Sequence, residues 1–214
     1  VTAIRRWGKQ IFIDLDQGVL YVHLGMTGKL LWNAAPGKHA RAIVEFDAGT
    51  LVYDDIRQFG RFEFFEQIPT GLEPGSPDAL GIAFEEFRGR LRSHRKSIKP
   101  LLLDQSFIAG VGNIYADETL FAARIHPRTA AARISTLRAR RLFDALLEVL
   151  RSAIEHRGSS ISDYVDSQGN RGSFQQSHRV YGREGQPCPV CGSAIRRIVL
   201  GQRSAHYCPR CQRA

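Results

Sequence analysis

Acidic residues are scarce in this chain, cysteine is scarcer, and no long apolar run occurs. The 214 residues contain 30 Lys and Arg against 21 Asp and Glu, which gives a formal net charge of +9 and a pI near 9.8. This balance favours acidic partners, nucleic acid before anionic membrane. No stretch approaches the roughly 18 apolar residues that a membrane-spanning helix needs. The sequence therefore predicts neither a membrane span nor a signal peptide.

Only four cysteines are present, and all lie in the last part of the chain. They form two Cys-x-x-Cys pairs separated by 16 residues, Cys188 with Cys191 and Cys208 with Cys211. Four cysteines are too few for the disulfide scaffold of a secreted protein, although two disulfides are the alternative interpretation. The spacing is typical of a four-cysteine zinc site. We therefore predict one structural Zn²⁺ and a reducing, cytoplasmic location.

The segment around these cysteines lacks acidic residues altogether. Between positions 187 and 214 there is no Asp or Glu. Five arginines occur there: Arg196, Arg197, Arg203, Arg210 and Arg213. A rigid, purely positive element suits a phosphate backbone, because each neutralised phosphate releases condensed counterions. The segment therefore indicates a nucleic-acid contact, with a solvated basic tail as the alternative.

The first 68 residues predict antiparallel β structure in a sandwich or barrel. Short alternating segments at 11–16, 19–24, 41–46, 50–53 and 61–65 are separated by turns that contain glycine. A stretch rich in Pro and Gly at 69–83 follows. Such a stretch is a typical linker, and it predicts a domain boundary.

The second half of the chain predicts helices, at 84–91, 100–104 and 114–123, and a long one that Ser135 caps and Gly158 ends. Two glycines in the segment 110–113 precede the third helix, and they can expose backbone N–H groups to a phosphate. Such turns also simply permit tight packing. The polar segment 159–179 predicts either a linker or a mobile lid over a site.

Five blocks of sequence, in the same order, resemble the formamidopyrimidine-DNA glycosylase family, which includes the endonuclease VIII enzymes. They are His23–Gly28, Asp55–Gly60, Gly110–Glu118, Val180–Arg183 and the four-cysteine tail. The resemblance implies an α+β multidomain fold with an incomplete antiparallel β-sandwich at 1–68. It also implies a helix–two-turns–helix domain at 84–182, with a lid loop at 159–179, and a zinc ribbon at 183–214.

The function that this resemblance implies is base-excision DNA repair. Family enzymes bind damaged double-stranded DNA, excise oxidised purines such as 8-oxoguanine and formamidopyrimidine, and then cut the strand as lyases. A monomer on the bacterial nucleoid is expected. Because a damaged base must leave the stack before its glycosidic bond is reached, apolar side chains are needed to fill the space. Met26 and Phe59 match the family's wedge, and Arg57 matches the contact to the orphaned base; core positions are the alternative for both apolar residues.

Further positions match the family's contacts to DNA. Lys9 corresponds to a catalytic-site lysine near the abasic-site phosphate, and Glu118 to an acid of the family. Gln58 stands where many relatives carry arginine. The remaining predicted DNA contacts are His23, Lys99, Asn113, Tyr181 and Arg203.

One family feature is not found at Val1, where the sequence begins. The family starts with Pro-Glu-Leu-Pro-Glu, in which the proline amine attacks the sugar to form a Schiff base. We therefore expect this chain to be a fragment without that nucleophile, inactive by itself. The alternatives are a damaged-DNA-binding protein without chemistry and an RNA-binding zinc-ribbon protein.

Overall fold

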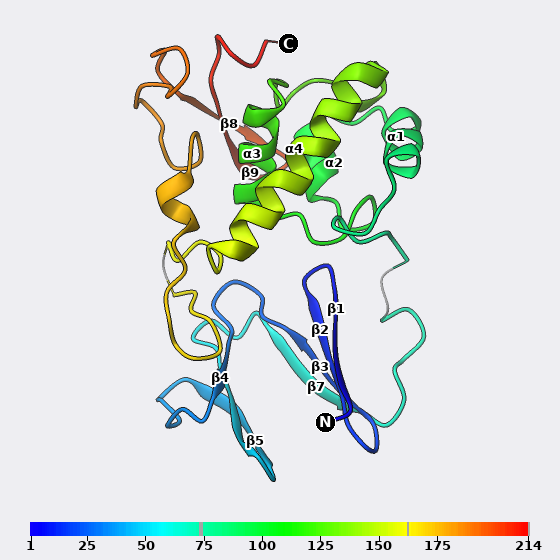
Figure 1. The fold of residues 1–214 in the computed structure, drawn as a ribbon, viewed down its shortest axis with the longest axis vertical. Helices are drawn as coiled ribbons and strands as arrows, with labels where there is room; N and C mark the ends of the chain where they lie inside the picture. Colours follow the sequence, from blue (N-terminus) through cyan, green and yellow to red (C-terminus); the bar gives the residue numbers. More distant parts are fainter. Residues whose placement is uncertain (73–74, 162, 214) are drawn as a thin grey trace. The chain divides into compact units, whose positions relative to one another are not determined.

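Residues 1–72, 75–161 and 163–213 are described by a computed structural model of the chain. They divide into two compact units, Val1–Pro74 with Ala153–Gln176 and Gly75–Ser152 with Ser177–Ala214. Parts of three predicted segments lie outside the described residues: 73–74 of the linker, 162 of the lid and 214 of the ribbon. Figure 1 shows the elements of each unit.

The first unit contains two antiparallel sheets. The four-stranded sheet has the order β1 (Ala3–Trp7), β2 (Gln10–Asp14), β3 (Val19–His23), β7 (Arg61–Phe65). The three-stranded sheet has the order β4 (Lys29–Trp32), β6 (Gly49–Asp54), β5 (Ala40–Phe46). The five strands that the sequence predicts are confirmed, and β1 and β4 are additional. β1 is exposed along its whole length, so it lacks the alternation that marks a half-buried strand.

Side chains from both sheets share one apolar core. Ile13 and Leu20 of the larger sheet pack with Leu51 of the smaller one, and Tyr53 stacks on Phe62 with ring centroids 5.2 Å apart. Burial of these faces is the main stabilising contribution, at roughly 25 cal/mol per Å² of apolar surface. The predicted sandwich is confirmed at the level of these packed sheets.

Residues 153–176 group with the sheets, although the sequence assigned them to the helical domain. The backbone N–H of Trp32 donates to the carbonyl of Ser167 at 2.8 Å, which adds this segment to the edge of β4. The Ser160 hydroxyl is buried, donates to the carbonyl of Tyr164 and accepts from the N–H of Gly172. These internal hydrogen bonds fix a segment that has little apolar surface to bury.

The second unit is built on four helices. They are α1 (Phe84–Ser93), α2 (Ile98–Leu103), α3 (Asn113–Ala122) and α4 (Thr136–Glu155). All four predicted helices are confirmed, and the Ser135 hydroxyl caps α4 by accepting from the N–H of Arg138 at 3.4 Å. Phe87, Leu91 and Leu142 lie in the core. Ala79 and Ile82, within the predicted linker, are buried in the same core, so this part of the linker belongs to the helical unit.

A small β-ribbon completes the second unit. β8 (Arg196–Leu200) and β9 (Arg203–Tyr207) form an antiparallel pair. Phe121 and Val180 form a small core with Cys188, Ile195 and Cys208. None of the helices in the described part of the chain combines the length and the apolar character required to cross a membrane.

Candidate nucleic-acid interface

The N-terminus of α3 and the start of β9 lie next to each other in the second unit. Gly110 adopts a φ of 106°, a conformation that favours glycine, and Gly112 precedes the first helical residue, Asn113. The Asn113 amide nitrogen lies 3.5 Å from the Ser204 hydroxyl. The neighbouring Arg203 is exposed. The Asn113 amide and the positive end of the α3 dipole therefore lie beside the strand that begins at Arg203.

A buried ionic network fixes β9 against α2 and α3. Lys99 and Asp117 are both fully buried, and Lys99 Nζ lies 2.5 Å from Asp117 Oδ1. Lys99 also donates to the carbonyl of Ser204. The other oxygen of Asp117 accepts from the backbone N–H of His206 at 2.9 Å and lies 3.1 Å from its Nδ1. One carboxylate thus joins three elements that are remote in the sequence.

This network corrects one predicted DNA contact. Lys99 was expected to touch phosphate, but its side chain is 0% exposed, so no backbone phosphate can reach its ammonium group. Burial lowers the pKa of Lys99, and the carboxylate of Asp117 opposes that effect. The prediction for Lys99 is therefore wrong: the residue supports the strand that carries Arg203.

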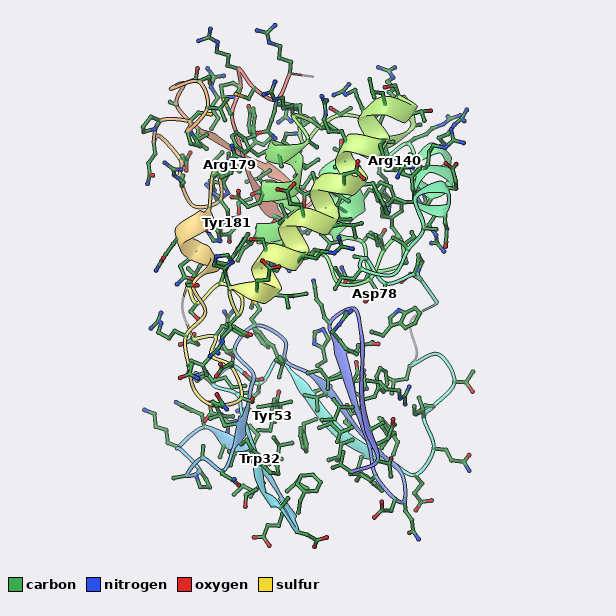
Figure 2. All side chains as sticks on the ribbon, viewed as in Figure 1. Trp32, Tyr53, Asp78, Arg140, Arg179 and Tyr181 are labelled. Carbon is green, nitrogen blue, oxygen red and sulfur yellow. The ribbon has the colours of Figure 1, made fainter. Side chains whose placement is uncertain are left out.

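Glu118, the next residue on α3, holds a different segment. Its carboxylate accepts three backbone N–H groups, from Arg179 at 3.0 Å, Val180 at 3.0 Å and Tyr181 at 2.8 Å. Burial raises the pKa of Glu118, and the three hydrogen bonds only partly offset this effect. Tyr181 lies with its ring 5.1 Å from the ring of His206. Figure 2 labels Arg179 and Tyr181 on this segment.

The four cysteines form a cluster that fits a metal ion. Their sulfur atoms all lie within 4.8 Å of one another, with 3.9 Å between Cys188 and Cys211 and 3.4 Å between Cys191 and Cys208. A tetrahedral zinc with Zn–S bonds of about 2.3 Å separates its sulfurs by about 3.8 Å. The cysteine side chains thus match the donor set of a structural zinc site.

The protonation of these thiols also favours a cation. Hydrogen bonds from Ser193 lower the pKa of the Cys191 thiol to about 6. Burial, reinforced by the neighbouring sulfurs, raises the pKa of Cys211 to about 12. A metal ion binds the thiolate form of cysteine. Neighbouring thiolates repel one another, and a bound cation would offset this repulsion and stabilise the deprotonated cysteines.

In the first unit, two adjacent loops present apolar side chains to solvent. Met26 is 54% exposed and Phe59 is 59% exposed, so neither occupies the core position that was the alternative. The guanidinium of Arg57 lies 4.9 Å from the centroid of the Phe59 ring. Two large apolar side chains on adjacent loops, with a cation beside one of them, form a surface that can pack against a partner.

Lys9 and His23 lie at the same end of the larger sheet. Lys9 is in the turn between β1 and β2, and His23 ends β3 opposite Gln10. Burial lowers the pKa of His23, and the charges of Lys9 and Arg61 lower it further. His23 Nδ1 accepts from the N–H of Gly25 at 3.2 Å. The neutral ring therefore carries its proton on Nε2, which is available as a donor.

Models of known families match three parts of the chain. The formamidopyrimidine-DNA glycosylase N-terminal domain matches residues 1–62, the H2TH domain of the same enzyme matches 71–165, and the zinc finger found in FPG and IleRS matches 185–214. A formamidopyrimidine-DNA glycosylase of Solibacter usitatus is 52% identical over 214 residues, which is 100% of this chain and 81% of that protein. The chain belongs to the formamidopyrimidine-DNA glycosylase family.

Other family members agree with this assignment. The glycosylase of Desulforamulus reducens is 43% identical over 98% of this chain and 79% of its own length. The crystal structure of the MutM (Fpg) protein of Thermus thermophilus superposes with a TM-score of 0.90 at 42% identity, covering 98% of this chain and 81% of that one. A complex of Lactococcus lactis Fpg with DNA containing an abasic site has a TM-score of 0.89 at 36% identity, covering 100% and 82%.

Several residues that organise the glycosylase surface were not predicted from the sequence. Asp55, Thr27 and Asp117 are buried polar residues that tie loops or elements together. All three fall within the blocks that carry the family resemblance, and this was the only signal that could have identified them. Asp55 lies 28 residues from its partner Thr27 in the sequence, and Asp117 lies 89 residues from its partner His206. No local sequence pattern could identify contacts between residues so far apart.

Proposed function

We propose that this chain acts in base-excision DNA repair by recognising a damaged base in double-stranded DNA. In this proposal the chain is part of a DNA glycosylase that removes oxidised purines, 8-oxoguanine and formamidopyrimidine. The same enzyme then cuts the DNA strand as a lyase. The observation that carries the proposal is the exposure of Met26 and Phe59 beside Arg57 on two adjacent loops. Complexes of Lactococcus lactis Fpg with Fapy-dG DNA and with abasic-site DNA support it.

The wedge formed by Met26, Arg57 and Phe59 suits an unstacked duplex. Extruding a base costs a few kcal/mol, least where the base is damaged or missing. Apolar side chains that enter the gap offset part of that cost by restoring contacts with the flanking bases. The guanidinium of Arg57, held over the Phe59 ring, offers donors in a fixed plane to the base that has lost its partner.

The phosphate contacts that we propose come from both units. Asn113, Tyr181 and Arg203 belong to the helical unit, in which the dipole of α3 adds to the positive charge. Lys9 and His23 belong to the sheets, and we propose that Lys9 lies near the phosphate of the abasic site. Neutral His23 would act as a hydrogen-bond donor through Nε2, rather than as a cation.

We further propose that Cys188, Cys191, Cys208 and Cys211 hold one structural Zn²⁺. The match of residues 185–214 to a zinc finger and the sulfur cluster support this assignment. The ion would supply no chemistry to the reaction, because four sulfurs close its coordination shell. It would fix the ribbon that presents Arg203.

The affinity of the chain for an abasic-site analogue tests the proposed function. We expect it to bind a duplex containing tetrahydrofuran about tenfold or more tightly than the intact duplex of the same sequence, because the extrusion cost of a few kcal/mol is removed. Fluorescence anisotropy at one fixed salt concentration measures both affinities. The double variant Met26→Ala with Phe59→Ala is the matched control, expected to bind both duplexes alike. Equal wild-type affinities for the two duplexes would exclude lesion recognition.

The chemical part of the proposal has its own measurement. Borohydride reduction traps a Schiff base between a lyase and abasic DNA, so we expect a covalent complex on a gel once the family's Pro-Glu-Leu-Pro-Glu segment is restored upstream of Val1. Strong lesion preference without any trapped complex in that restored protein would instead support a damaged-DNA-binding protein. A preference for structured RNA over the lesion duplex would favour an RNA-binding role.

Arg203 provides a test of the phosphate contacts. We expect Arg203→Ala to weaken binding to every duplex alike and to reduce the slope of log K against log salt concentration by about one, because one phosphate contact is lost. Arg92→Ala removes the same charge from an exposed position at the end of α1, and its slope should stay at the wild-type value. An unchanged slope in Arg203→Ala would remove this residue from the interface.

A further inference from the structure

Asp55 is a buried carboxylate to which the proposed function gives no role. It follows β6 and is 0% exposed. Its Oδ1 accepts from the Thr27 hydroxyl at 2.5 Å and from the N–H of Arg57 at 3.3 Å. Its Oδ2 accepts from the N–H of Gly60 at 2.9 Å and from the Tyr53 hydroxyl at 3.1 Å. Each oxygen therefore receives one hydroxyl and one backbone N–H.

These four donors come from the parts of the unit that carry the wedge. Thr27 belongs to the loop 24–28, which presents Met26, and the two backbone donors belong to the loop 55–60, which presents Arg57 and Phe59. Tyr53, which is labelled in Figure 2, lies on β6, the strand that Asp55 follows. Because a single carboxylate bonds to both loops, neither loop can move away from the other without breaking a buried hydrogen bond.

The two loops also touch directly through their backbones. Gly25 has a φ of 61°, and a Cβ atom there would lie 2.7 Å from the carbonyl carbon of Phe59. The side chain of Gly60, if it had one, would collide with the Tyr53 hydroxyl. Both glycines therefore permit a close approach that leaves no room for a side chain, directly below the exposed wedge.

Hydrogen bonds keep Asp55 ionised in this buried position. Burial would raise its pKa, but the bonds from Thr27, Gly60, Tyr53 and Arg57 outweigh burial and lower the pKa below the ordinary value. The negative charge of Asp55 is thus compensated mainly by hydroxyl and backbone N–H dipoles of the two loops and of Tyr53. Its stabilising effect is present above the unfolded-state pKa and is lost as the pH falls through the lower folded-state pKa.

We propose that Asp55 is a positioning residue for lesion recognition, which joins the loops 24–28 and 55–60 so that Met26, Arg57 and Phe59 are held in place before DNA binds. This inference rests on the proposed function. A wedge that is ordered in advance does not have to lose conformational freedom on the duplex, and this saving appears as affinity for the lesion. Asp55 does not touch DNA in this scheme; it acts through the wedge.

Asparagine cannot replace Asp55 in this arrangement. The amide has the same shape but only one acceptor oxygen, and its NH₂ group must then face one pair of donors. The hydroxyl of either pair can rotate to accept, whereas the N–H of Arg57 or of Gly60 cannot. An amide nitrogen at the Oδ2 position takes the acceptor away from the N–H of Gly60. At the Oδ1 position it leaves the N–H of Arg57 with only the Thr27 hydroxyl oxygen, 3.2 Å away, so either orientation removes one of the hydrogen bonds that join Asp55 to the loop 55–60.

A double-mutant cycle tests the inference. The measured quantity is the ratio of affinities for tetrahydrofuran duplex and intact duplex, in the wild type, Asp55→Asn, Phe59→Ala and the double variant. We expect Asp55→Asn to reduce this ratio by about tenfold, because losing one buried hydrogen bond that fixes the wedge costs on the order of one factor of ten. Affinity for intact duplex should not change. The double variant should be no worse than Phe59→Ala, because both changes disable the same wedge.

A control variant and the remaining outcomes distinguish a failure of the proposed function from a failure of the role assigned to Asp55. Asp47→Asn removes the same charge from an exposed turn in the β5–β6 hairpin and should keep the wild-type ratio. A wild type without lesion preference overturns the proposed function itself. A wild-type ratio in Asp55→Asn, or effects that multiply in the double variant, overturns the role of Asp55 alone. Should Asp55→Asn fail to fold, Thr27→Val removes one donor and keeps the carboxylate; an unchanged ratio in that variant overturns the inference.

Discussion

Replacing Cys191 with alanine is expected to unfold the ribbon and abolish stoichiometric zinc binding. A structural zinc contributes on the order of 10 kcal/mol to the folding of a small domain, and three sulfurs cannot close the site. The loss should spread to Phe121 and Val180, which share a small core with Cys188. Zinc content by mass spectrometry and the amide NMR spectrum of residues 185–213 measure the two effects.

Val190 offers a matched control for this experiment. It lies between the first two cysteines and is 51% exposed, so Val190→Ala changes the same loop without touching a ligand or the core. We expect one zinc per chain and an unchanged spectrum for that variant. One zinc per chain in Cys191→Ala, with a native spectrum, would contradict the assignment of the metal site.

The second large effect is expected at Asp117. Asp117→Ala leaves the ammonium group of Lys99 buried without its carboxylate, and breaking a buried ion pair in this way costs about 3–5 kcal/mol. The backbone N–H of His206 also loses its acceptor. The free energy of unfolding in urea, measured with excess zinc, should therefore fall by about that amount. Lesion binding should weaken as well, since β9 carries Arg203.

The exposed pair Lys96–Asp104 is the control for Asp117. Its side chains are 62% and 29% exposed, and such a pair contributes about 0–1 kcal/mol, so Lys96→Ala should change stability little. Replacing Lys99 with Met and Asp117 with Leu together should recover part of the stability, because no charge stays buried alone. Equal losses in Asp117→Ala and Lys96→Ala would refute the buried-pair explanation.

The elements of the fold were largely predictable, because their signals are local. Alternating segments gave five strands, apolar spacing gave four helices, and Cys-x-x-Cys pairs gave the sulfur cluster. Strand β4 was missed because Lys29–Trp32 is short and only partly buried. The grouping of residues 153–176 with the sheets was not predictable, because the hydrogen bond of this segment to Trp32 joins residues far apart in sequence.

Side-chain roles were less predictable than elements. Lysine in a basic chain favours a phosphate contact, but the burial of Lys99 depends on Asp117 and Ser204, neither of which is near it in sequence. The exposure of Met26 and Phe59 was implied by the family resemblance, not by composition, which favoured core positions. The role of Asp55 was equally unpredictable. In the sequence, an Asp whose carboxylate is buried among four hydrogen-bond donors cannot be distinguished from any other Asp that follows a strand.

The placement of Asp117 and Glu118 on α3 has a consequence for chain length. These neighbouring carboxylates bind different segments, β9 and residues 179–181. One residue inserted between Asn113 and Asp117 would rotate both carboxylates by about 100° around the helix axis, so both attachments would fail together. The number of residues in this interval is therefore as constrained as their identity, whereas a surface loop such as the turn at Asp47 can accept a longer sequence.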